Sequence, residues 1–205
     1  MTHTLHRIGD AESLQNDICI MAFPHKGINY EGSKPHLQWF FQEAHDCGAV
    51  NLGMVICGSM ITFSLAEVIE KVKDGRGAFT VFDDLDKATL FLSKVKEKKC
   101  GISITVSTLW DLALAMSEKV GVKPHSVNRS IGVFGDTNLL PPEGIQRITS
   151  MCGHAQVSPL LVEQVMEDVN SGRMTAREGA IKLAKPCICG FFNVTRAEKL
   201  LDFVK

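Results

Sequence analysis

Four residues in the C-terminal third of the chain have the types and spacing of a metal site. Cys152 and His154 form one pair two residues apart, and Cys187 and Cys189 form a second. On turn or extended backbone such a pair can direct both side chains at one ion, and neighbouring glycines let each loop fold tightly. Three thiolates and one imidazole favour zinc or an iron–sulfur cluster over magnesium or calcium.

The spacing is compatible with two kinds of metal centre. A closed Cys₃His zinc site would stabilise a small helical region, because binding of structural zinc contributes to the free energy of folding. A 4Fe–4S cluster held by three cysteines would leave one iron for His154 or for a substrate, which suits redox or Lewis-acid chemistry. No ferredoxin-type CxxCxxC run is present. A metal-free interpretation, with the cysteines simply at helix ends, stays open.

The chain has seven cysteines, which is many for a protein without a secretory signal. An odd number of cysteines in that context argues against a disulfide framework. Because reduced thiols survive best in an anaerobic, reducing environment, this surplus favours the iron–sulfur interpretation.

Composition excludes several classes of protein. The 205 residues are 45% hydrophobic and 22% charged, with a formal net charge of −1. The apolar fraction is too high for a disordered chain. The charge balance argues against a nucleic-acid binder that works by neutralising phosphates, and no apolar run is long enough to cross a membrane. We therefore expect a cytoplasmic protein.

Residues 1–138 alternate between short apolar runs and amphipathic segments. Strands separated by helices of this length predict right-handed crossovers and a mostly parallel sheet. Runs that are apolar throughout also indicate a sheet covered on both faces. We predict a three-layer open α/β sandwich, a Rossmann-like ligand-binding domain, with strands at 17–23, 53–57, 78–82, 100–106 and 130–134.

Residues 139–205 show helical patterns and no strand. Ser158 followed by proline, and Thr175 with Glu178 three residues later, are typical helix starts. We predict a helical Cys/His metal-binding region with helices at 143–151, 159–171, 175–184 and 194–204.

Candidate ligand-binding residues follow several predicted strands. In an open parallel sheet the carboxyl ends of the strands border one crevice, and His25, Lys26, Ser59 and Arg129 lie at or near such ends. Their hydroxyl and cationic groups suit a small anionic molecule. No serine-hydrolase elbow or dinucleotide glycine motif appears, so no catalytic residue is assigned.

These observations support three hypotheses. The first is a metal-dependent, iron–sulfur protein of anaerobic metabolism, an oxidoreductase or lyase that acts on a small anionic molecule with or without a redox partner. The second is a non-catalytic binding or scaffold protein with a structural Cys₃His zinc site. The third is metal-free, with the C-terminal helices forming a homo-oligomer surface through Leu160, Leu161, Val165, Leu200, Leu201 and Val204.

Overall fold

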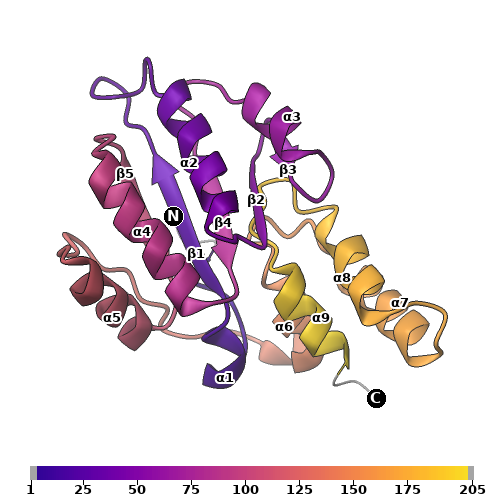
Figure 1. Cartoon of the computed structure of the whole chain (residues 1–205). Coiled ribbons are helices and arrows are strands. Elements are labelled where there is room, and N and C mark those ends of the chain that lie inside the picture. Colours follow the sequence, from indigo (N-terminus) through magenta and orange to yellow (C-terminus); the bar gives the residue numbers. More distant parts are fainter. Residues whose placement is uncertain (1–3, 203–205) are drawn as a thin grey trace.

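The computed structural model describes residues 4–202 and contains a five-stranded sheet in which all paired neighbours run antiparallel (Figure 1). The mostly parallel, Rossmann-like sheet predicted from the sequence is therefore wrong. The strands lie in the spatial order β3 (Gly58–Ser59), β2 (Asn51–Met54), β4 (Ala78–Phe82), β1 (Ile18–Phe23) and β5 (Ser103–Ser107).

The physical reason for this error lies in how the two crossover helices place their strands. Helix α2 (Lys34–Asp46) joins β1 to β2, and β4 lies between them, antiparallel to both. Helix α4 (Leu85–Lys98) joins β4 to β5, and β1 lies between those two. Each helix thus connects two strands that run in the same direction. The space between those two strands is occupied by an antiparallel strand, β4 in the first case and β1 in the second. This is a split β-α-β arrangement.

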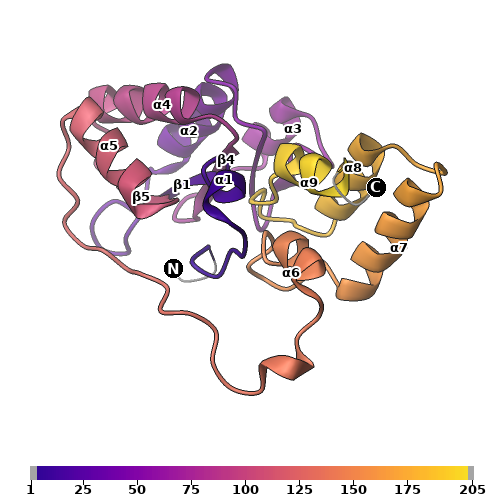
Figure 2. The same cartoon turned by 90° about the horizontal axis from the view of Figure 1, so that it is seen from below.

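Both faces of the sheet are covered, which explains why its strands resemble those of a parallel sheet. Ile18 and Ile20 of β1 pack on the side of α2 and α4, whereas Cys19 and Met21 pack on the side of the C-terminal helices. Strands buried on both faces are apolar at consecutive positions whatever their direction. In Figure 2 the helices α2, α4 and α5 (Trp110–Val120) lie together, away from the C-terminal helices.

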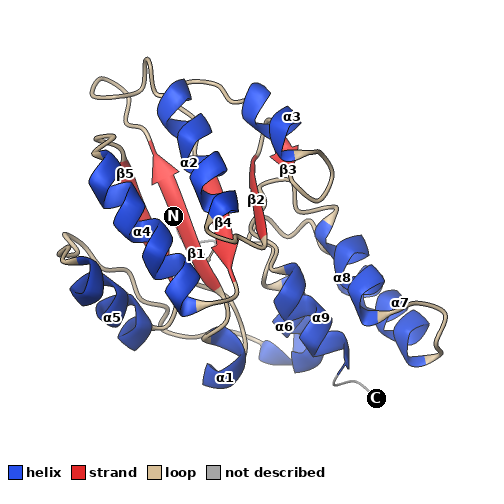
Figure 3. Cartoon of the chain, viewed as in Figure 1, coloured by secondary structure: helices blue, strands red, loops and turns tan. Residues whose placement is uncertain are grey.

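The remaining helices agree closely with the sequence patterns (Figure 3). The short α1 (Ala11–Leu14) precedes β1, and α3 (Leu65–Glu70) begins after Ser64, which caps it. All four helices predicted for the C-terminal region are confirmed, as α6 (Glu143–Thr149), α7 (Pro159–Asn170), α8 (Ala176–Ala184) and α9 (Val194–Asp202).

The predicted strand at 130–134 is absent. Residues 123–140 form a long exposed loop, with a single 3₁₀ turn at Thr137–Leu139. The division of the chain near residue 138 stays a prediction, although the C-terminal helices share one core with β1 and β4. Within residues 4–202, no helix is both long and apolar enough to cross a membrane.

The capping box of α8 provides a first test of the fold. The Thr175 hydroxyl accepts a hydrogen bond from the backbone N–H of Glu178, whose carboxylate accepts one from the backbone N–H of Thr175. We expect Thr175→Ala to lower the free energy of unfolding by about 1 kcal/mol in urea titrations, because a helix N–H loses its partner. Ser130→Ala, in the exposed loop, is the control, and equal effects of the two changes would contradict the assignment.

Candidate functional site

Three of the four predicted metal ligands, Cys152, Cys187 and Cys189, form a buried cluster that we call the thiol centre. Cys152 lies in the turn after α6, and the other two lie in the turn between α8 and α9. The Sγ atoms of Cys187 and Cys189 are 3.7 Å apart, and the Cys152 thiol lies beside that of Cys187. All three side chains are at most 3% exposed. The fold therefore unites the two cysteine loops.

The hydrogen bonds of the thiol centre make Cys189 its most acidic member. Cys152 interacts with Cys187, and Cys187 with Cys189, where either sulfur atom can be the donor. The bond from Cys187 lowers the pKa of Cys189, against the effect of burial. The interaction with Cys187, together with burial, raises the pKa of Cys152. For Cys187 the bond from Cys152 lowers the pKa, but the bond to Cys189 and burial outweigh it and raise the pKa to about 12.

Hydrogen bonding from backbone N–H groups lowers the pKa of all three thiols. Such bonds favour the thiolate form, and at metal–thiolate sites they orient the ligands and tune the metal. The donors are the N–H groups of His154 and Gln156 for Cys152, of Phe192 for Cys187 and of Phe191 for Cys189.

The Cys187–Cys189 turn is held against strand β2. Gly190 has φ +83°, and a Cβ atom there would lie 2.3 Å from the backbone nitrogen of Gly53. The Asn51 side-chain amide donates a 3.0 Å hydrogen bond to the carbonyl of Phe192. Because glycine alone has no Cβ, the turn can approach the strand this closely.

Arg7 fastens the two cysteine loops to each other. Its Nη2 atom donates to the carbonyl of Phe191 at 2.6 Å and to that of Met151 at 3.3 Å. Its Nη1 atom lies 2.5 Å from the carboxylate of Asp17. Burial opposes the charge of Arg7, but Asp17 outweighs it and raises the pKa of the guanidinium. A fixed positive charge therefore stands beside the thiol centre.

Asp17 is shared by a second buried arginine. Arg196 Nη1 lies 2.9 Å from Asp17 Oδ2, and the Asn193 amide donates to Asp17 Oδ1 at 3.1 Å. The side chains of Arg196 and Asp17 are 2% and 0% exposed. Burial lowers the pKa of Arg196. Two guanidinium groups thus face one carboxylate, and the excess positive charge favours an anion among the neighbouring thiols.

Sequence reasoning did not find this Arg7–Asp17–Arg196 network. Charged side chains are rarely fully buried, so a sequence pattern assigns them to the surface. Arg196 does stand among the buried residues Val194, Ala197 and Leu201 of α9, which is a weak signal that its side chain points inward.

The fourth predicted ligand lies outside the cluster. The His154 side chain is exposed, and its role as a metal ligand stays a prediction. Among the residues that the structure describes, no group of three or more His, Cys, Asp or Glu side chains is arranged as a ready-made metal site. Metal binding at the thiol centre would replace the S–H hydrogen bonds, because the ligands must be deprotonated.

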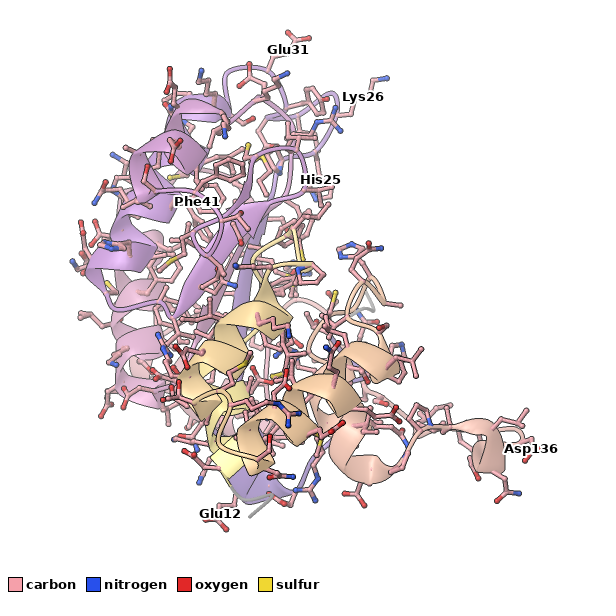
Figure 4. The ribbon with its side chains drawn as sticks, turned by 90° about the vertical axis from the view of Figure 1, so that its right-hand side faces the viewer. Glu12, His25, Lys26, Glu31, Phe41 and Asp136 are labelled. Atoms are coloured by element: carbon pink, nitrogen blue, oxygen red, sulfur yellow. The ribbon has the colours of Figure 1, made fainter. Side chains whose placement is uncertain are left out.

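The four residues predicted to bind an anion do not all follow strands that run in one direction. Strands β1 and β2 run in the same direction, but β5 runs opposite to them, so the carboxyl ends of the strands do not border one crevice; anion binding by these residues stays a prediction. His25 and Lys26 are exposed in the loop after β1, far from Glu12 near the other end of the molecule (Figure 4). Ser59 is buried in β3, and its hydroxyl has no hydrogen-bond partner in the described structure. The Arg129 guanidinium lies 4.5 Å above the ring of Trp110.

A cavity of about 490 Å³ lies along β5. The hydroxyl of Thr108, at the end of that strand, is buried there without a described hydrogen-bond partner. Aromatic, cationic and polar side chains line the cavity, among them Trp39, Lys96, Trp110, Lys123 and Asn128. This lining suits a small molecule with both apolar and anionic parts.

The surface expected for oligomerisation through the C-terminal helices is largely used within the molecule. Val165 and Leu201 are buried in its own core, and Leu161 and Leu200 pack against that core. Leu160 is 76% exposed, and Val204 lies outside the described residues.

Comparison with known proteins gives no relative of this chain. No protein-family model matches it, and no curated protein or solved structure is similar to it. The function must therefore be argued from the site.

Cys19 of β1 predicts a specific dependence of stability on pH. Burial raises the pKa of this thiol from 9.0 to about 12. Between these two values the unfolded chain loses the proton while the folded chain keeps it, so stability falls as pH rises. We expect ionisation of Cys19 in the unfolded chain to lower the free energy of unfolding by about 1.4 kcal/mol between pH 8 and 10. Urea titrations of the wild type and of Cys19→Ala should differ in their pH slope by this amount, and equal slopes would contradict it.

Proposed function

We propose that this protein is metal-dependent and holds its metal at the thiol centre, through Cys152, Cys187 and Cys189. One observation carries the proposal: three buried cysteine side chains from two separate loops are neighbours. Soft sulfur ligands select zinc, iron–sulfur clusters or copper(I) over hard cations.

The charge around the thiol centre supports an anionic metal–thiolate complex. Three thiolates around one divalent ion carry one net negative charge, and thiolate-bound iron–sulfur clusters are anionic as well. The buried Arg7–Asp17–Arg196 network carries one net positive charge. A metal–thiolate complex would therefore compensate a buried charge, and compensation of this kind strongly affects stability in a medium of low dielectric.

If the metal at the thiol centre is an iron–sulfur cluster, the protein would be an enzyme. Three cysteine ligands, with His154 exposed, leave one position for a substrate, and reactive metal sites keep such a position open. When bound, the cluster would supply redox or Lewis-acid chemistry. Arg7 and the backbone N–H groups would stabilise its thiolate ligands. The small anionic substrate, a redox partner and a cytoplasmic location belong to the same proposal.

Metal analysis of protein purified without oxygen tests the proposal. We expect stoichiometric iron and acid-labile sulfide with visible absorption, and loss of both metal and absorption in Cys187→Ala and Cys189→Ala. The matched control is Cys57→Ala, because Cys57 is equally buried but lies in the core on the other face of the sheet. Full metal content in both thiol-centre variants would overturn the proposal.

A structural zinc site is the second candidate, and the sulfur spacing favours it. Zinc–sulfur bonds of about 2.3 Å in tetrahedral geometry place two ligand sulfur atoms about 3.8 Å apart, close to the observed 3.7 Å. A colourless protein with one zinc per chain, which loses the fold of α6 to α9 on chelation, would support this candidate. In that case His154→Ala should weaken zinc binding, because a closed structural site needs a fourth ligand.

A further inference from the structure

Strand β5 leaves one edge of the sheet open. It pairs with β1 on one side only, and within residues 4–202 no backbone hydrogen bond joins its outer edge to another segment. Proteins usually protect such an edge with charged residues, proline or a bulge. The strand sequence Ser103-Ile-Thr-Val-Ser107 has no charge and no proline, and its pairing with β1 is continuous. All five residues are only partly buried, whereas every residue of β1, β2 and β4 except Phe23 is buried.

An exposed loop with large apolar side chains begins beside this edge. Residues 122–128 line the cavity along β5, and the chain then continues as the exposed loop before α6 (Figure 2). Ile131 is 84% exposed, Phe134 76% and Leu139 83%. A long loop with several large exposed apolar side chains is unusual in a compact domain unless it meets a partner.

We propose that a second copy of this chain covers this surface, with the two β5 strands pairing antiparallel across a twofold axis. The strand suits its own copy because an antiparallel pair of identical strands is automatically isologous. Centred on Thr105, the pairing places Ser103 opposite Ser107 and brings no like charges together. The exposed loop of each copy then lies next to the β5 cavity of the other copy, where the apolar side chains of the loop lose contact with water.

The charges at the two ends of β5 are also complementary. Lys99 precedes the strand and Asp111 follows it, and both are exposed. Antiparallel pairing brings the basic start of one strand toward the acidic end of the other. This arrangement favours a second copy over an unrelated strand, because opposite charges steer the correct register.

Sedimentation of the wild-type protein over a wide range of concentration is the first measurement. We expect a species of twice the 22.5 kDa chain mass. Thr105→Glu places two like charges opposite each other on the axis and should weaken the dimer about 100-fold. Thr105→Lys should do the same, whereas mixing the two variants should restore a dimer. The controls are Asn170→Glu and Asn170→Lys, because Asn170 is exposed at the end of α7. These changes should leave the dimer unchanged.

Cross-linking keeps the proposal testable if charged variants fold poorly. Thr105→Cys places two thiols opposite each other, so mild oxidation should give a disulfide-linked dimer, and Asn170→Cys should not. A wild-type protein that stays monomeric at high concentration would overturn the proposal. So would a dimer that persists in Thr105→Glu and is not cross-linked through Thr105→Cys.

Discussion

Asp17→Asn is expected to lower the free energy of unfolding by about 3–5 kcal/mol, among the largest effects of any single substitution in this protein. The Asp17 carboxylate is fully buried and contacts both Arg7 and Arg196. The asparagine amide has nearly the same shape but no charge. Two buried guanidinium groups would then face each other without compensation, and the clamp that Arg7 places on the cysteine loops would weaken.

Urea unfolding followed by far-ultraviolet circular dichroism measures this effect. Asp86→Asn is the matched control, because Asp86 pairs with Lys119 at 2.8 Å but both side chains are largely exposed. Exposed pairs contribute little to stability, so this variant should behave like the wild type. If Asp17→Asn were as stable as Asp86→Asn, the buried network would not hold the fold in the way described.

Gly190→Ala is expected to lower the free energy of unfolding by about 3 kcal/mol, which is the second of the two largest effects expected. Two penalties combine at this position: the left-handed backbone conformation at φ +83°, and a new methyl group 2.3 Å from the backbone of β2. A left-handed non-glycine residue costs roughly 1–2 kcal/mol. Relieving the contact must also move the Cys187–Cys189 turn, because the backbone of β2 cannot give way.

Gly172→Ala separates these two penalties. Gly172 has φ +71°, but a Cβ atom there would meet nothing within 4 Å, so only the backbone penalty of roughly 1–2 kcal/mol applies. We expect Gly190→Ala to unfold at lower urea than Gly172→Ala and to retain less metal after purification without oxygen. Equal stability and equal metal content in the two variants would show that contact with β2 does not position the cysteine turn.

The residue pattern was sufficient to predict the two cysteine loops. Glycine and proline beside the cysteine pairs, and helix-start residues at Ser158 and Thr175, are local signals, and the predicted helices around them are confirmed. Capping and loop formation depend on residues close together in the chain. Such features can therefore be predicted without knowledge of the tertiary structure.

The order and direction of the strands depend on contacts between residues far apart in the chain. The sequence correctly indicated buried strands joined by helices, because both faces of the sheet are covered. It gave no sign that β4 inserts between β1 and β2, since an antiparallel neighbour and a parallel one bury the same apolar side chains. Because β5 also runs opposite to β1, the carboxyl ends of the strands do not meet at one edge as a parallel sheet would require.

The sequence by itself determined which residues could hold a soft metal, because thiol chemistry belongs to the residue type and loop formation to its neighbours. Only the tertiary structure decided that Cys152 meets Cys187 and Cys189, that His154 stays exposed, and that Arg7, Asp17 and Arg196 are buried beside them. Arg7 and Asp17 come from the N-terminal region, and the cysteines come from two C-terminal turns. Their electrostatic coupling exists because the fold excludes water from the place where these segments meet.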